Sequence, residues 1–260
     1  MKNSTSLALV TGASSGIGMV YARELLKQGV DVIAVGRRKE RLEELAAEFP
    51  QRRVDAVVAD LSTVEGVEKL SAICRTEPLT LLVNNAGVSH YMSFADLPVE
   101  KARELMNVKV LAPTLLAHAA LPGMLERGKG TVVNVAGMLA FGATAPLGQA
   151  AGRATYVSTL AHLVNLTLAL HEEFQNTGVN FQVLCPGVVA TEFHKRQGMD
   201  LSAFPRMTPE KVVEASFKSL QLGEVVCAPG VENGQLIAEA LKASLAAFQG
   251  QSPELASRYQ

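Results

Sequence analysis

Short apolar runs alternate with longer segments of helical periodicity along nearly the whole chain. Between residues 42 and 49, the apolar positions follow the i, i+3, i+4, i+7 spacing of a single helix face. The apolar runs bounded by Gly, Asn or Asp are typical of buried strands. The pattern predicts strands at residues 7–10, 31–35, 56–59, 80–83, 131–135, 180–184 and 225–228. It predicts helices at 19–27, 42–49, 64–76, 98–127, 154–177 and 235–248, and one that opens at Thr208-Pro209-Glu210.

This alternation predicts an α/β fold: a doubly wound, Rossmann-like parallel sheet of about seven strands with helices on both faces. A chain of 260 residues fits one such domain, which we expect to span residues 1–260. Ligands then bind at the C-terminal ends of the strands. The polar segment 191–207 is long for a connection in a compact domain and contains Gly198 and Pro205. We interpret it as a substrate lid, with packing on its own sheet as the alternative.

Charge and composition exclude several classes of partner. The chain has 24 Lys and Arg against 25 Asp and Glu, so it lacks the basic field that nucleic acid binding needs. No apolar run approaches the roughly 18 residues of a membrane span, and the N-terminus lacks a signal-peptide pattern, so we expect a cytoplasmic protein. Cys74, Cys185 and Cys227 lack C-x-x-C spacing and are expected to be reduced thiols. We expect no metal site.

Three glycines follow the first apolar run and precede the first helical segment. Gly12, Gly16 and Gly18 have the spacing G-x-x-x-G-x-G. Glycine lets the backbone approach an anion closely, and the N-terminus of the following helix favours negative charge. The turn therefore predicts a phosphate-binding site, although a tight turn that binds nothing has the same pattern.

Four motifs in order resemble the short-chain dehydrogenase/reductase family. The glycine turn is similar to the family motif T-G-x-x-x-G-x-G, and Asp60-Leu61 is similar to the Asp with which the family contacts adenine. Residues 84–87 match the family motif N-N-A-G. Pro186-Gly187 with Thr191 is similar to the family motif P-G-x-x-x-T. The resemblance implies a nicotinamide cofactor. The residues implied to bind it are Gly12, Ser14, Ser15, Gly16, Ile17, Gly18, Asp60, Leu61, Asn84, Ala86, Gly87, Tyr156, Pro186, Gly187 and Thr191.

The end of the second strand bears on the choice of cofactor. An acidic residue there would accept a hydrogen bond from the ribose 2′-OH of NAD(H), whereas a basic residue would pair with the 2′-phosphate of NADP(H). This chain has Arg37 and Arg38, and arginine pairs well with phosphate. We therefore expect NADP(H) to be preferred over NAD(H), unless both arginines are merely solvated.

The resemblance also implies a catalytic Ser, Tyr, Lys and Asn, of which two types are matched. Tyr156 matches the Tyr and Asn107 the Asn that holds a water in the proton relay. Leu160 occupies the Lys position of Y-x-x-x-K, and Gly137 occupies the Ser position. The longer loop 142–152 contains Thr144, which would supply a substitute hydroxyl or else be a solvated surface residue.

An unperturbed phenol has a pKa of about 10, so about one Tyr156 in a thousand is ionised at neutral pH without a nearby cation. Oxidation of an alcohol needs the tyrosinate as a base, whereas reduction of a carbonyl needs the neutral phenol as an acid, and the neutral form is abundant. We therefore expect an NADPH-dependent carbonyl reductase with an atypical active site, acting on a small molecule such as a lipophilic carbonyl compound. The alternative is a catalytically silent nucleotide-binding subunit. The two long helices, 98–127 and 154–177, are expected to form a homodimer or homotetramer, or a hetero-oligomer with an active paralogue.

Overall fold

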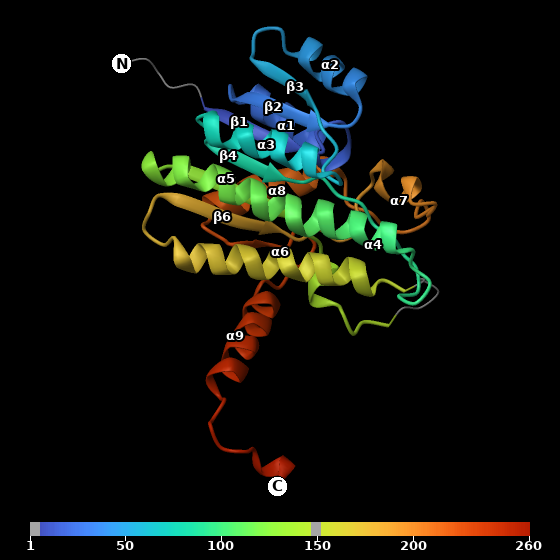
Figure 1. Cartoon of the computed structure of the whole chain (residues 1–260), viewed down its shortest axis with the longest axis vertical. Helices are drawn as coiled ribbons and strands as arrows, with labels where there is room; N and C mark the ends of the chain where they lie inside the picture. Colours follow the sequence, from blue (N-terminus) through green and yellow to red (C-terminus); the bar gives the residue numbers. More distant parts are fainter. Residues whose placement is uncertain (1–5, 147–151) are drawn as a thin grey trace. The chain divides into compact units, whose positions relative to one another are not determined.

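The computed structural model describes residues 6–146 and 152–260. Seven parallel strands form one sheet in the order β3-β2-β1-β4-β5-β6-β7. This confirms the predicted doubly wound fold, with its switch point between β1 and β4. The strands are β1 (Leu7–Thr11), β2 (Asp31–Gly36), β3 (Val54–Val58), β4 (Leu81–Asn84), β5 (Gly130–Val135), β6 (Val179–Leu184) and β7 (Val226–Cys227). Figure 1 shows the sheet with its flanking helices.

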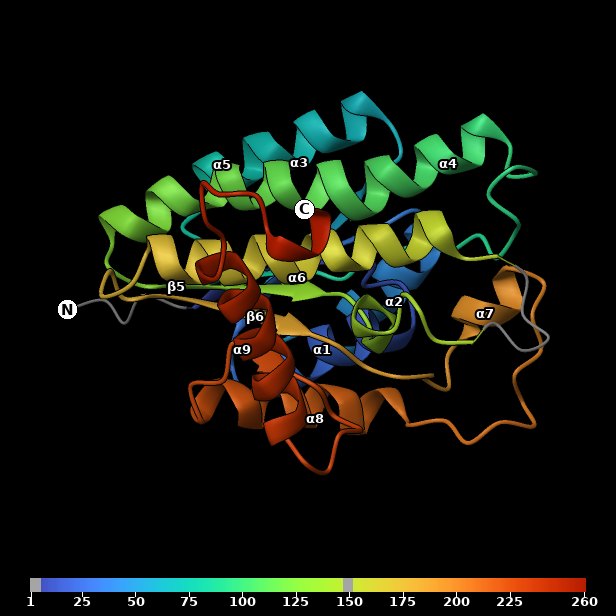
Figure 2. The ribbon, with the colours of Figure 1, turned by 90° about the horizontal axis from the view of Figure 1, so that it is seen from below.

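Helices cover both faces of the sheet, as Figure 2 shows. The α-helices of the described residues are α1 (Gly16–Lys27), α2 (Lys39–Glu48), α3 (Val64–Thr76), α4 (Val99–Met106), α5 (Ala112–Glu126), α6 (Ala154–Glu173), α7 (Glu192–Arg196), α8 (Pro209–Gln221) and α9 (Gln235–Gln249). Short 3₁₀ turns lie at Met138–Phe141 and Ser257–Tyr259. The buried side chains of α3, α5 and α6 pack on one face, and those of α1, α2 and α8 on the other.

Strand β1 shows how the sequence pattern builds the two cores. Side chains alternate across a strand, so Leu7 and Leu9 join the core beneath α3 and α5, while Ala8 and Val10 join the core beneath α1. All four are buried. A strand that is apolar at every position is the expected signature of a parallel sheet with two covered faces.

Several boundaries differ from the predicted ones. The long helix predicted at 98–127 is divided by a π-helical turn, Asn107–Leu111. Helix α6 ends four residues before the predicted 177, ahead of Asn176 and Gly178, which both have positive φ. Helix α7 lies inside the segment expected to be irregular, and β7 has two residues rather than four.

The sheet and its helices lie within a compact unit, Met1–Pro229, and Gly230–Gln260 forms a second compact unit that contains α9. The sequence, read as one domain, does not mark this division. Within the described residues, the stretch Val99–Glu126 is apolar and long enough to cross a membrane, but half of its most apolar window is buried inside the protein. A core helix of a soluble protein has the same properties, so a cytoplasmic location stays a prediction.

Candidate active site

The glycine turn is closely packed against the segment that follows β4. Gly12 has φ +70°, and a Cβ there would lie 2.7 Å from Asn85 Nδ2. A Cβ at Gly18 would lie 2.5 Å from the Gly12 carbonyl oxygen. Thr11 fixes the contact, because its Oγ1 accepts from the backbone N–H groups of Asn85 and Ala86, each at 2.9 Å. Side chains larger than glycine are therefore excluded at both glycine positions.

A cavity of about 950 Å³ lies at the C-terminal ends of the strands and begins at this turn. Most of the residues that the sequence predicts to bind the cofactor line it. They are Gly12, Ser14, Ser15, Gly16, Ile17, Arg37, Arg38, Asp60, Leu61, Ala86, Gly87, Tyr156, Pro186, Gly187 and Thr191. Gly18, Asn84 and Asn107 do not line it. Asn84 is buried behind the wall and donates to Asn134 Oδ1 at 2.9 Å, which joins β4 to β5.

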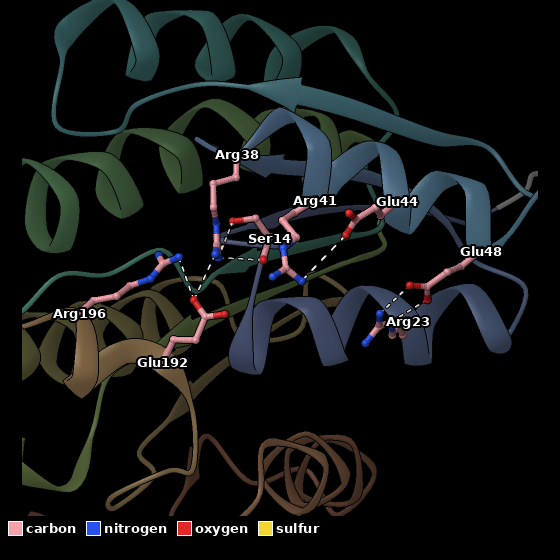
Figure 3. A network of polar contacts seen from close by, with 8 residues as sticks. All are labelled: Ser14, Arg23, Arg38, Arg41, Glu44, Glu48, Glu192 and Arg196. Atoms are coloured by element: carbon pink, nitrogen blue, oxygen red, sulfur yellow. Dashed lines mark hydrogen bonds and ion pairs between the residues drawn. The ribbon is translucent and has the colours of Figure 1, made fainter. Parts of the chain in front are cut away.

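Two arginines lie at the end of the cavity beside β2. Arg38 Nη2 donates to the Ser14 carbonyl oxygen at 2.8 Å, and Nη1 donates to Glu192 Oε2 at 3.1 Å. Arg196 pairs with the same carboxylate at 2.8 Å, as Figure 3 shows. Burial acts to raise the pKa of Glu192, but the charges of Arg38 and Arg196 hold it below its ordinary value. Arg37 is more exposed and lies 3.9 Å from Asp60.

Tyr156 lies in the first turn of α6 and is 8% exposed. Its ring is 5.5 Å from that of Tyr91 and 6.5 Å from that of Phe193, between ring centroids. Burial, with a smaller contribution from Tyr91, raises the pKa of Tyr156 well above its ordinary value. The phenol is therefore neutral throughout the physiological range and can act as a proton donor.

The two positions that depart from the family pattern lie next to each other. Leu160 is buried one helical turn after Tyr156, and both Leu160 and Gly137 line the cavity. A Cβ on Gly137 would be 3.4 Å from Leu160 Cδ1, an ordinary contact, so the backbone leaves room for a serine. Thr144 is exposed and does not line the cavity, so no substitute hydroxyl comes from it. Residues 147–151 of the same loop lie outside the described residues.

Lys109, within the π-helical turn, lines the cavity wall, whereas Asn107 does not. Asn107 Nδ2 donates to the Ser62 carbonyl oxygen at 2.7 Å, away from the cavity. Lys109 Nζ donates to the Val135 carbonyl oxygen at 2.9 Å, and the side chain is 5% exposed. Sequence motifs missed this residue. A lone lysine within the apolar stretch 105–121 was the signal that a buried charge lies here.

The predicted lid segment borders the cavity. Its lining side chains are Thr191, Phe193, His194, Arg196, Gln197, Met199 and Leu201. Phe193 and His194 pack edge to face, with ring centroids 5.3 Å apart. The sequence pattern identified the segment but not Tyr91 and Arg153, which line the cavity from other loops. Opening and closing of this lid stays a prediction.

Three cysteines are free and buried. Burial raises the pKa of Cys74 and of Cys185 to about 12, which makes both unreactive as nucleophiles. Across the part of the chain that the structure describes, no three His, Cys, Asp or Glu side chains are grouped in a way that could hold a metal ion.

Comparison with known proteins identifies the family. A sequence model of the short chain dehydrogenase family matches residues 6–201, so the chain belongs to that family. It is 31% identical to a very-long-chain 3-oxoacyl-CoA reductase of Anas platyrhynchos over 83% of this chain and 69% of that protein. It is 32% identical to the inactive hydroxysteroid dehydrogenase-like protein 1 of Homo sapiens, over 71% of this chain and 56% of that protein.

Solved structures agree with this assignment. A short-chain dehydrogenase from Sphingobium yanoikuyae, solved in complex with NADPH, is 28% identical, covers 98% of this chain and 100% of its own, and superposes with a TM-score of 0.92. The bulky-bulky ketone specific alcohol dehydrogenase from Comamonas testosteroni is 25% identical, with 98% of each chain covered and a TM-score of 0.87. The fold is thus that of a short-chain dehydrogenase, and most residues that match the cofactor motifs line this cavity.

The residues present fit such a cofactor. The glycine turn leaves the space that a pyrophosphate needs, and Cβ atoms at Gly12 and Gly18 would remove it. The cavity extends from this turn to Tyr156 without leaving the strand ends. A dinucleotide bound with its pyrophosphate at the turn therefore has room for its nicotinamide beside Tyr156.

Proposed function

We propose that this protein is an NADPH-dependent reductase of bulky, apolar ketones. One observation carries the proposal. A single cavity joins the glycine turn and Arg38 at one end to a buried, neutral Tyr156 at the other. The same space thus offers an anion site and a proton donor, the two groups that carbonyl reduction by a nicotinamide nucleotide requires.

In this reaction, bound NADPH supplies a hydride to the carbonyl carbon. Tyr156 donates its phenolic proton to the carbonyl oxygen as that oxygen takes the electron pair of the π bond. The tyrosinate left behind recovers a proton from solvent, so the alcohol and the oxidised nucleotide leave with all atoms accounted for. Because burial keeps Tyr156 protonated, this direction is favoured over oxidation of an alcohol, which needs the tyrosinate as base.

Two features support NADPH over NADH. Arg38 is held in place by the Ser14 carbonyl oxygen, with its guanidinium at the end of β2 where a 2′-phosphate would lie. The neighbour from Sphingobium yanoikuyae was solved with NADPH. Binding of the phosphate would replace Glu192 as a partner of Arg38, which couples cofactor binding to α7.

The walls beyond Tyr156 support an apolar substrate. The cavity lining includes the large, mainly apolar side chains Tyr91, Met138, Leu139, Phe193, Met199 and Leu201. Such walls bind a large hydrophobic body and leave the carbonyl at the polar end. The Comamonas testosteroni neighbour acts on bulky-bulky ketones, which is the same substrate class.

A second candidate is the catalytically silent, nucleotide-binding subunit. The absence of the motif lysine and serine at Leu160 and Gly137 favours it, as does similarity to a human protein described as inactive. In either case we propose association through α4 and α5. Met106, Leu111 and Leu115 are between 42% and 49% exposed on this surface.

Oxidation of NADPH, followed by absorbance with paired small and bulky ketones, tests the proposal. We expect turnover of the bulky ketones and its loss in Tyr156→Phe, with NADPH binding retained. Binding of NADPH without turnover of any ketone supports the silent subunit instead. No binding of NADPH contradicts both.

A further inference from the structure

Lys109 is a buried cation that the mechanism above does not use. Its side chain is 5% exposed, and one hydrogen bond, to Val135 O, is found for Nζ among the described residues. An ammonium has three donors, and lysine is almost never buried without a paired charge. Ion pairs within the described residues do not include Lys109. Among the residues that the structure describes, no carboxylate offsets this desolvated charge.

The ammonium lies where three strands end at the floor of the cavity. A Cβ on Gly87, after β4, would be 3.3 Å from Lys109 Nζ. Val135, its acceptor, is the last residue of β5. Cys185 follows β6 and is close enough to affect the pKa of the ammonium. Lys109 and Tyr156 line the same cavity, so the charge and the proton donor share one space.

Leu160 reaches this region from the neighbouring helix. Helix α6 packs against the π-helical turn that carries Lys109. The Leu160 side chain ends 3.4 Å from the Cβ position of Gly137, two residues beyond Val135. Helix α6 thus carries Leu160 where the family has a lysine, while the π-helical turn packed against α6 carries Lys109.

Asn107 and Lys109, two positions apart, point to different sides of the π-helical turn. Asn107 faces Ser62, which leaves Lys109 facing the strand ends. π-Helical turns of this kind are frequent at functional sites.

We propose that Lys109 supplies the active-site cation of this protein, in place of a lysine at position 160. Its ammonium donates to the nicotinamide end of the bound nucleotide and stabilises the negative charge that develops on Tyr156 as the phenol gives up its proton. The second role rests on the proposed reductase function, whereas the first requires only that a nicotinamide nucleotide binds. Lys109 returns to its initial state without net change, because it donates hydrogen bonds and transfers no group.

The charge on Lys109 depends on pH within an accessible range. Burial lowers the pKa of this lysine to about 8, so it is mostly protonated at neutral pH and loses its charge as pH rises through that value. Burial raises the pKa of Cys185 to about 12, and the pKa values of Tyr91 and Tyr156 are also raised. Burial lowers the pKa of His194. These four groups are therefore uncharged in that range.

Other charged groups lie near this region. Arg153, immediately before α6, lines the cavity. On α4, Glu104 pairs with His90, with 2.9 Å between Oε2 and Nε2. A change in NADPH affinity centred near pH 8, where the pKa of Lys109 lies, is the expected signature of this residue.

The test compares Lys109→Met, which keeps the length and removes the charge, with Lys109→Arg, which keeps the charge at high pH. Lys101→Met on α4 is the matched control, because Lys101 is exposed. The full chain is titrated with NADPH by fluorescence from about pH 6 to pH 9.5, around the lysine pKa. Ketone turnover and thermal melting are measured alongside. A double variant, Lys109→Met with Leu160→Lys, returns a cation from α6.

We expect Lys109→Met to bind NADPH about 10- to 100-fold more weakly at neutral pH and to lose the pH dependence near pH 8, as removal of a charged donor predicts. Lys109→Arg should bind tightly up to the highest pH, the double variant should recover part of the affinity, and Lys101→Met should match the wild type. The melting temperature of Lys109→Met should not fall, because a desolvated charge is removed.

Unchanged affinity and pH dependence in Lys109→Met would overturn the proposal. A large fall in melting temperature in both Lys109→Met and Lys109→Arg would also overturn it, because the role of Lys109 would then be to stabilise the fold. A wild type that binds NADPH with the expected pH dependence but reduces no ketone contradicts the reductase function and leaves the cofactor role of Lys109 standing.

Discussion

Replacement of Arg38 by Met should separate affinity for NADPH from affinity for NADH. Arg38 Nη2 is fixed at 2.8 Å from the Ser14 carbonyl oxygen, and its side chain is 28% exposed. A preorganised guanidinium loses little rotamer freedom when it meets a phosphate. NADH has no 2′-phosphate. A loss of NADH affinity in the variant would therefore reveal damage to the glycine turn and not loss of a phosphate contact.

The structure sets the size of the effect. A hydrogen bond to a charged group contributes about 1.5–3 kcal/mol. Partial exposure of Arg38 and competition from Glu192 at 3.1 Å place this contribution near the lower end, about 1.5 kcal/mol. Since 1.4 kcal/mol corresponds to a factor of ten, the NADPH dissociation constant should rise about tenfold, and that of NADH less than threefold.

Calorimetric titration of both nucleotides measures the two changes. Arg75→Met is the matched control, because Arg75 is an exposed arginine on α3. Glu192→Gln should act in the opposite direction and tighten NADPH, because it releases Arg38. Equal weakening of both nucleotides in Arg38→Met would refute the reasoning, since Arg38 would then only shape the turn.

Three further substitutions probe the site and the fold. Gly18→Ala should abolish nucleotide binding or folding, seen by circular dichroism and NADPH fluorescence, because its Cβ would lie 2.5 Å from the Gly12 carbonyl oxygen. Gly137→Ser should raise kcat/KM for ketones at unchanged melting temperature, because its Cβ has only ordinary contacts. A fall in both quantities would show that the serine position is not available. Tyr21→Phe should lower the free energy of unfolding in urea by about 1–2 kcal/mol, since it breaks a buried bond to Ser216, whereas the exposed Tyr259→Phe should not.

Periodicity was sufficient for the fold because both faces of a parallel sheet are buried. Strands such as Leu7–Thr11 are apolar at every position, and the helices between them have one apolar face. The ends of helices were less well predicted where the backbone conformation of single residues determines them. The positive φ of Asn176 and Gly178 ends α6 early, and propensity alone does not locate such a turn.

The site shows a similar division. Arg38 and Tyr156, which the sequence indicated as site residues, both line the cavity, because each is tied to a strand end or a helix start. The family motifs also selected Asn107, whose side chain bonds the Ser62 carbonyl oxygen instead of lining the cavity, while Lys109, two positions further on, lines it. The sequence therefore indicated that the motif lysine is missing, while the location of a replacement cation required the structure.

The most direct test of the central claim follows the hydride itself. NADPH carrying deuterium at the transferring position of the nicotinamide is incubated with the protein and a bulky aryl ketone, and the alcohol is analysed by mass spectrometry. We predict one deuterium on the carbinol carbon with the wild type and no labelled alcohol with Tyr156→Phe. Tight NADPH binding without labelled alcohol from the wild type would contradict the reductase assignment.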